Sequence, residues 1–370
     1  YRYPPLFLLL FLPVWILPQP LAVYFWYWLN LAAVYLTGRV VAGELKQAAQ
    51  GTAVKISLIL LISFIAVFKY LWMSIRYGNV HLIVVCLLFG AFYFVFKQKD
   101  KTAGLLLALA ISIKVFPVLT LPYFFIQKKW RFLAVTIGFV FVFNLIPAFY
   151  FGFGTNLKLL GDWYRHVIVE SEFHDSQGPL NFSLKGQMQR TFTQIDYPAR
   201  IADSSYQNIN LFSLKDNQVN LLWKLAVVFF MVSTLFILWS SSKSPPDNLT
   251  EKKIKRLSLQ EFGLMICTML LVEPYTGTMY FTALFLPLAV LVYSVLTEES
   301  QASRIHRFAL GFILFANCFL PIIPGSDVQR FILVLGLDFY ITLYLWCALA
   351  YNLLRTRNKH LQFEFQPISI

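Results

Sequence analysis

The stretch LALAISIKVFPVLTLPYFFIQKKWR, residues 107–131, is almost wholly apolar as far as residue 126, yet Lys114 stands near its middle and Pro117 follows three residues later. A lysine within a membrane span costs about 2.5–3.5 kcal/mol on insertion scales, so it normally faces a partner or a wet cavity. Proline lacks a backbone donor and interrupts a helix. The stretch therefore predicts two short helices that meet near Lys114, in place of one continuous helix.

Apolar runs recur along the whole chain, which is 58% hydrophobic and 13% charged. Soluble domains are about 45–50% apolar and about 25% charged. The runs have roughly the 17–25 residues that cross about 30 Å of hydrocarbon, and they are too numerous to be signal peptides. The sequence predicts an all-α polytopic membrane protein with about ten or more hydrophobic helices. The runs are 56–75, 80–96, 103–126, 132–151, 219–240, 278–296, 308–324 and 331–354.

Lysine and arginine cluster between these runs. Six segments hold 19 of the 31 basic residues, and the positive-inside rule places them, with the C-terminus, in the cytoplasm. This distribution is typical of membrane topology, so the net charge of +13 does not indicate a nucleic-acid partner. The six segments are 38–55, 97–102, 127–131, 242–258, 298–307 and 355–359.

Residues 103–126 lie between two of these basic segments, so they must return to the side that they left. They are too few for two crossings at about 1.5 Å per residue. We therefore expect a re-entrant pair of short helices with its apex at Lys114–Pro117; the alternative is a single span with one basic end outside. Non-helical backbone at that depth is stable only when it is buried in protein or lines a water-filled cavity.

The charge pattern divides the chain into an N-terminal transmembrane region (1–152), an outer loop (153–217), a C-terminal transmembrane region (218–357) and a cytoplasmic tail (358–370). The outer loop holds 7 of the 18 acidic residues and is rich in aromatic residues, so we expect a folded subdomain on the non-cytoplasmic side. Residues 242–258 are predicted to be a solvated linker.

Two further charges stand in apolar surroundings. Asp338 is expected to pair with a lysine of another helix, with a catalytic role as the alternative, and Lys69 is expected to face a partner or to snorkel. The four cysteines show no CxxC spacing, so neither a disulfide framework nor a metal site is indicated.

Five stretches, in this order, resemble motifs of glycosyltransferase family 87, a group of polytopic enzymes of the GT-C type. The second matches a Gly-Gln-x-Asn segment, the third places Lys114 and Pro117 on a lysine and a proline of the family, and the fourth matches an Asn-Gln-Ser stretch. The stretches are YRYPP (1–5), YGNVHLIVVCLLFGAFYF (77–94), the segment around Lys114 (102–131), GPLNFSLKGQMQR (178–190) and LVEPYTGTMYFTALFLPL (271–288).

The chain departs from the family pattern at several of these positions. Gly78 directly precedes Asn79, Phe182 replaces the glutamine of Asn-Gln-Ser, Glu273 replaces a serine, and Tyr280 stands about where a histidine is expected. GT-C enzymes carry a catalytic carboxylate in a first outer loop that precedes the YRYPP stretch. We therefore expect that this sequence lacks the N-terminal helix and that loop.

The resemblance implies transfer of a sugar, mannose or another hexose, from a polyprenyl-phosphate donor in the cell membrane to an acceptor hydroxyl of a glycolipid or glycan on the outer face. The chemistry needs a carboxylate to accept the proton of the hydroxyl and cations to stabilise the departing phosphate. Lys114 and Arg190 are predicted to bind the donor phosphate. Neither a metal nor a cofactor is expected, because the sequence holds no Asp-x-Asp motif or histidine cluster.

The remaining site predictions concern the catalytic carboxylate and the residues that contact the substrates. If the family base lies upstream of Tyr1, the carboxylates in this chain are acceptor contacts or surface charges. Two alternatives to the enzyme remain open, a transporter or flippase for a lipid-linked or amphipathic solute and a non-catalytic membrane scaffold. The predicted catalytic carboxylates are Glu172, Asp175 and Glu273, and the predicted substrate-binding residues are Asn79, Asn181, Ser183, Tyr280 and His174.

Overall fold

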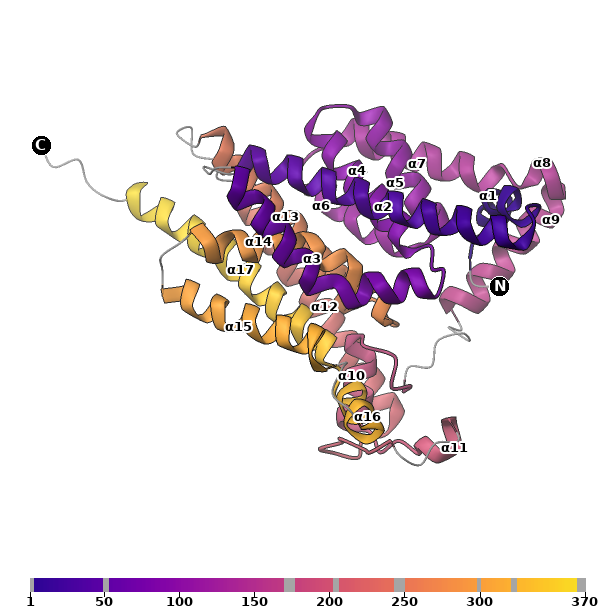
Figure 1. The fold of residues 1–370 in the computed structure, drawn as a ribbon. Helices are drawn as coiled ribbons and strands as arrows, with labels where there is room; N and C mark the ends of the chain where they lie inside the picture. The colour runs from indigo at the N-terminus through magenta and orange to yellow at the C-terminus, as the bar shows by residue number, and fades with distance from the viewer. Residues whose placement is uncertain are drawn as a thin grey trace, which may run out of the picture. The chain divides into compact units, whose positions relative to one another are not determined.

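The chain is an all-α polytopic membrane protein, as the sequence predicts (Figure 1). The computed structural model describes residues 3–48, 53–169, 177–201, 206–242, 250–297, 301–320 and 325–364, and no strand occurs in these ranges. Within them, five helical segments are long and apolar enough to cross a membrane: Lys55–Arg76, Trp130–Phe151, Asp216–Ser242, Thr278–Thr297 and Asp327–Thr356.

The chain forms two compact units, which we call unit 1 (residues 1–41 and 71–175) and unit 2 (residues 42–70 and 176–370). The division falls inside the predicted outer loop 153–217, whose place outside a membrane stays a prediction. Unit 1 contains α1 (Pro5–Trp15), most of α2 (Gln19–Ala48), α4 (His81–Phe96), α5 (Asp100–Ile113), η1 (Phe116–Thr120), α6 (Leu121–Ile126), α7 (Trp130–Leu145), α8 (Ala148–Phe151), α9 (Phe153–Trp163) and η2 (Tyr164–Val169).

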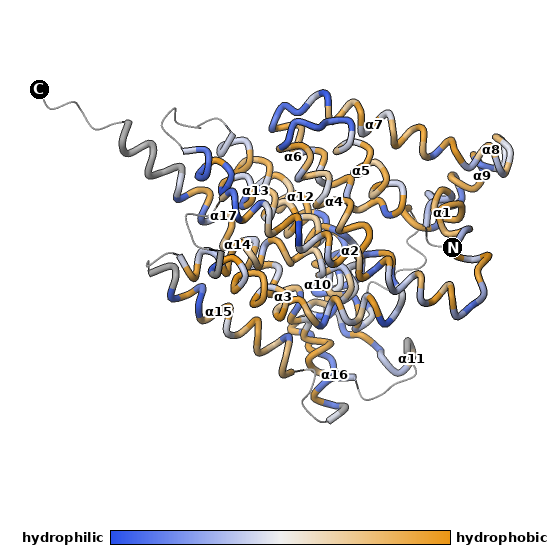
Figure 2. Tube along the Cα trace, turned by 45° about the horizontal axis from the view of Figure 1, so that its top comes forward, coloured by the Kyte–Doolittle hydropathy of each residue, from blue (hydrophilic) through white to orange (hydrophobic). Residues whose placement is uncertain are grey.

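In unit 1, α5 packs between α4 and α7. Gly104 makes the close approach to α7 possible, because a Cβ at this position would lie 2.6 Å from Cγ1 of Val135. Gly104 is early in α5 and Val135 is early in α7, so the two helices begin at the same end of the unit. Figure 2 shows apolar residues along much of these helices and hydrophilic residues in the turns beside α6 and the start of α7.

Helix α5 ends at Lys114, whose backbone is extended (φ −146°, ψ 128°). The short helices η1 and α6 then lead back toward the end at which α5 and α7 begin. With 14 residues, α5 is about 21 Å long at 1.5 Å per residue, less than the roughly 30 Å of a hydrocarbon core. The predicted interruption near Lys114 is therefore present; its position within a membrane stays a prediction.

In unit 2, α13 packs against α12, α14 and α17, and every residue of α13 from Leu259 to Val272 is buried. The indole Nε1 of Trp346 donates to the hydroxyls of Thr234 and Thr268, which ties the three helices α17, α12 and α13 together. The unit contains part of α3 (Ala53–Arg76), and α10 (Leu184–Phe192), α11 (Tyr197–Ile201), α12 (Asp216–Ser242), α13 (Glu251–Val272), η3 (Thr278–Leu284), α14 (Phe285–Thr297), α15 (Gln301–Cys318), α16 (Ser326–Leu335) and α17 (Leu337–Glu364).

The expectation that residues 242–258 form a solvated linker is wrong for the part from Glu251 onward, which is the first part of α13. The ammonium of Lys255 forms an ion pair with Glu44 at 2.5 Å, and both side chains are largely buried. The charged segment is therefore helical, and one of its lysines has a carboxylate partner within the unit.

The prediction that Asp338 pairs with a lysine of another helix is confirmed. Lys69 of α3 lies 2.5 Å from Oδ1 of Asp338, at the start of α17, and Tyr70 donates its hydroxyl to the same oxygen over 2.9 Å. Asn317 of α15 donates to the backbone carbonyl of Ala66 and lies beside Tyr70. This polar cluster joins three helices of unit 2.

Candidate functional site

The interruption after α5 brings Lys114 to a histidine of α4. The ammonium of Lys114 lies 3.0 Å from Nδ1 of His81, and the imidazole is fully buried and stacked on Phe116 with 4.8 Å between ring centroids. Because an ammonium is only a donor, Nδ1 accepts and the ring proton is on Nε2. His81 therefore fixes the position of the Lys114 ammonium as a hydrogen-bond acceptor.

The turn before His81 is built by the Gly78–Asn79 pair of the second motif. Gly78 follows the end of α3 by two residues and has φ +59°, a conformation that glycine adopts without strain. Its carbonyl accepts a hydrogen bond from Nε1 of Trp26 over 2.8 Å. Oδ1 of Asn79 accepts from the backbone N–H of His81 over 3.0 Å, so Asn79 caps the start of α4. A substrate-binding role for Asn79 stays a prediction.

In unit 2, the turn containing Asn181 and Ser183 is hydrogen-bonded to the segment that follows α13. Nδ2 of Asn181 and Oγ of Ser183 both donate to the carbonyl of Pro274, at 3.2 and 3.0 Å. Oδ1 of Asn181 accepts from the backbone N–H of Thr276, and the N–H of Phe182 donates to the carbonyl of Thr276. These hydrogen bonds join two segments that are about 90 residues apart in the sequence. The side chains of Asn181 and Ser183 are both buried.

Arg190 of α10 supports the same turn from inside the unit. Its Nη1 donates to the carbonyls of Gly178 and Asn181, at 3.1 and 2.7 Å, and its Nη2 donates to Oε1 of Gln187 at 2.9 Å. The whole residue is 1% exposed. Burial lowers the pKa of Arg190 to about 10, which leaves the guanidinium charged at neutral pH.

The turn between α16 and α17 closes over this arginine. Gly336 has φ +69°, and a Cβ there would lie 2.4 Å from Oε1 of Gln187 and 3.0 Å from Nη2 of Arg190. Oη of Tyr340 accepts a hydrogen bond from Nε2 of Gln187 over 3.1 Å. The guanidinium is consequently enclosed by α10, the turn at Gly178–Asn181 and the start of α17.

Glu273 and Tyr280 lie before and after the segment 274–276, to which Asn181 and Ser183 are hydrogen-bonded. Glu273 is the C-cap of α13 and directly precedes Pro274, whose carbonyl receives the two side-chain hydrogen bonds. Tyr280 belongs to η3, and both residues are half-buried. Glu273 is thus next in the chain to the residue that the Asn181–Ser183 turn binds, while its predicted catalytic role stays a prediction.

The predicted residues Glu172, His174 and Asp175 lie outside the described residues. His81 is a site residue that the sequence analysis did not predict, although it lies in the second motif. The signal in the sequence was its position shortly after the Gly78–Asn79 pair. Among the described residues, no group of three or more His, Cys, Asp or Glu side chains is placed to hold a metal ion.

The comparison with known families gives one finding for this chain. The family model described as glycosyltransferase family 87 matches residues 1–251, which include Lys114, Asn181 and Arg190 but end before Glu273. No curated protein and no solved structure matches the chain.

Proposed function

Because the chain belongs to glycosyltransferase family 87 and is a membrane glycosyltransferase, we propose that it moves a hexose, such as mannose, from a polyprenyl-phosphate donor to an acceptor hydroxyl on the outer face of the membrane. The acceptor is a glycolipid or a glycan. The observation that carries the proposal is the ammonium of Lys114, which caps an interrupted helix and is held on a buried histidine within the matched region.

The reaction forms a bond between the acceptor oxygen and the anomeric carbon, and it breaks the bond between that carbon and the phosphate oxygen. The acceptor proton goes to a carboxylate, and polyprenyl phosphate leaves with increased negative charge. Lys114 stabilises that charge as the bond breaks, which lowers the barrier because the cation is already in place. The extended backbone at Lys114 keeps the ammonium at the end of α5, where a helix would otherwise continue.

Arg190 has a different task in this proposal from the one that the sequence suggests. Its guanidinium donates to two backbone carbonyls and a glutamine, so we assign it to holding the Gly178–Ser183 turn. That turn in turn fixes the segment after Glu273, and a catalytic role for Glu273 stays a prediction. Direct phosphate binding by Arg190 stays a prediction that the experiments below separate from this role.

The test is an assay of the purified protein in lipid nanodiscs with polyprenyl-phosphate mannose that is radiolabelled in the sugar, together with extracted membrane glycolipids. We expect label to move from the donor to a glycolipid. A parallel assay in sealed vesicles follows the unreacted donor: label that crosses the bilayer while no glycolipid is labelled contradicts the transferase and supports a flippase. A polyprenyl-phosphate glucose donor tests whether mannose is the preferred hexose.

A further inference from the structure

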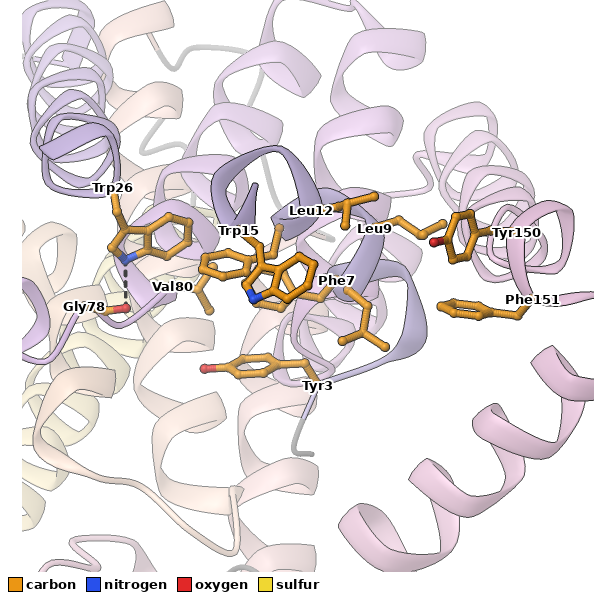
Figure 3. A pocket seen from close by; sticks show the side chains of 12 residues that line it. Tyr3, Phe7, Leu9, Leu12, Trp15, Trp26, Gly78, Val80, Tyr150 and Phe151 are labelled. Carbon is orange, nitrogen blue, oxygen red and sulfur yellow. Dashed lines mark hydrogen bonds between the residues drawn. The ribbon is translucent and has the colours of Figure 1, made fainter. Parts of the chain in front are cut away.

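Unit 1 contains an apolar pocket of about 540 Å³ beside the turn that leads to His81 (Figure 3). Helix α1 supplies half of the lining residues, and the rest are Tyr3, Trp26, the Gly78–Val80 turn and the end of α8. The lining residues are Tyr3, Phe7, Leu8, Leu9, Phe11, Leu12, Trp15, Trp26, Gly78, Val80, Tyr150 and Phe151.

The sequence explains why this wall is aromatic. Phe7 and Phe11 are one turn apart on the same face of α1, and Tyr3 lies just before the helix; the three rings form a row with centroids 4.7 Å (Tyr3–Phe7) and 5.9 Å (Phe7–Phe11) apart. Phe11 meets Trp26 edge to face at 5.3 Å, and Trp26 is held by its hydrogen bond to the carbonyl of Gly78. The row of rings is therefore fixed to the same turn that caps α4.

The chemistry of the lining favours a hydrocarbon chain over a sugar as the occupant. None of the lining residues carries a charge, and the indole N–H of Trp26 is already used by Gly78. A sugar site needs several placed polar groups, whereas a hydrocarbon chain needs apolar contacts of this kind. The pocket thus fits the apolar part of an amphiphile.

The position of the pocket indicates where the polar end of that amphiphile lies. Val80 lines the pocket, and the next residue, His81, holds the ammonium of Lys114. Helix α1 also packs directly on α5, the helix that Lys114 caps. The pocket and the ammonium are thus linked through two consecutive residues, Val80 in the lining and His81 on the cation, and this pairing suits a molecule with an anionic head and a hydrocarbon tail.

We propose that this pocket binds the isoprene units nearest the phosphate of the donor's polyprenyl tail, while the phosphate lies at Lys114. This inference rests on the proposed function and extends it by naming the place of the tail. An isoprenoid tail is methyl-branched and partly unsaturated, so it presents flat segments to the row of rings on α1. The pocket is of the size of a small-molecule site and holds part of the long tail, whose remainder extends into lipid.

A substitution on α1 tests the pocket with a matched control on the next residue. Leu9→Trp fills the pocket, whereas Leu10→Trp adds the same bulk to an exposed side chain that does not line it. We expect Leu9→Trp to weaken the binding of undecaprenyl phosphate about tenfold, equivalent to about 1.4 kcal/mol, and to leave the binding of inorganic phosphate unchanged. Equal effects of the two variants, or equal binding of hexadecyl phosphate and undecaprenyl phosphate by the unaltered protein, overturn the proposal.

A labelling experiment on the unaltered protein provides the second measurement, in case Leu9→Trp does not fold. A prenyl phosphate with a diazirine near its phosphate end is photolysed in nanodiscs, and the labelled peptides are mapped. We expect label on the peptide that contains Phe7 and Phe11 and on the peptide that contains Trp26. Label elsewhere overturns the pocket, as does equal labelling of these peptides by a phospholipid with a diazirine in its acyl chain.

The two proposals fail separately, because labelling does not require sugar transfer. If label reaches the α1 peptide but no donor supports transfer, the pocket stands and the proposed function fails. If transfer occurs while label falls outside the lining residues, the function stands and the pocket fails.

Discussion

Lys114 and Arg190 are both cations in the region that matches the family, yet the structure gives them opposite surroundings. Lys114 is half-buried at the end of an interrupted helix and contacts a neutral ring nitrogen. Arg190 is fully buried, and its guanidinium faces two backbone carbonyls and a glutamine side chain. Both terminal nitrogens of Arg190 donate to groups of the protein, which ties the guanidinium to the fold. Lys114 is instead positioned by a histidine at the end of a helix, where we propose that a substrate phosphate binds.

This difference predicts that removing Lys114 affects transfer far more than folding. Lys114→Met keeps the length of the side chain without the charge, and we expect the rate of sugar transfer to fall about a hundredfold or more, as for loss of one preorganised donor. Thermal unfolding is expected to change less than in Arg190→Met, because Lys114→Met removes the donor of one buried acceptor, Nδ1 of His81. Lys101→Met, at an exposed position of the same helix, serves as the control and is expected to keep the rate. Near-normal transfer by Lys114→Met rejects the phosphate-binding role.

Removing Arg190 is expected to have the opposite signature. Arg190→Met leaves the buried carbonyls of Gly178 and Asn181 without this donor, so we expect the free energy of unfolding to fall by about 3 kcal/mol, measured by thermal or denaturant unfolding in detergent. Arg190→Lys keeps the charge and some of the hydrogen bonds, and an intermediate loss is expected.

The transfer rate of the folded fraction decides between the two roles of Arg190. If the guanidinium only holds the turn, this rate changes much less than in Lys114→Met. If Arg190→Met lowers the transfer rate as much as Lys114→Met does and leaves the unfolding free energy unchanged, Arg190 is a phosphate ligand, as the sequence suggests. The proposed difference between the two cations is then wrong.

Lys69 is a third cation, and its partner is a carboxylate. Lys69→Met leaves Asp338 buried beside the Tyr70 hydroxyl, so the variant is expected to be less stable by about 2 kcal/mol. This is less than for Arg190, because the Lys69 side chain is 22% exposed and water replaces part of the interaction. Lys55→Met on the same helix is the matched exposed control. A double variant with Asp338→Asn is expected to recover part of the loss, and a loss that is simply additive contradicts the pair.

The comparison also shows what a sequence pattern contains and what it lacks. The end of α5 was predictable, since Pro117 and a lysine in an apolar run are local signals. The partner of that lysine was not predictable, because His81 is 33 residues away and is brought there by packing of α4 on α5. The surroundings of Arg190 were not predictable either. Its charge suggested that it binds the donor phosphate, and only the fold shows that its guanidinium donates to backbone carbonyls.

The helical start of α13 was missed for a related reason. Its segment EKKIKRLS is highly charged, and a charged segment between apolar runs is typical of a solvated loop. Glu44, which is distant in sequence, forms an ion pair with Lys255, and the helix includes these charged residues before its apolar part. Local composition predicts where hydrocarbon-soluble helices lie, but not how far they extend beyond the hydrocarbon.

The smallest expected effect concerns pH, and it follows from the burial of Arg190. Burial lowers the folded-state pKa of Arg190 to about 10, below its ordinary value, so between these two values the unfolded chain binds more protons than the folded chain. The stability contribution of this group therefore rises with pH only in that alkaline window. Between about pH 6 and about pH 8 both states hold the proton, so the difference in unfolding free energy between the unaltered protein and Arg190→Met is expected to be constant. A difference that changes by more than about 1 kcal/mol across this range means that a group titrating near neutrality interacts with the guanidinium, and the account of Arg190 as a cation enclosed by neutral acceptors is then wrong.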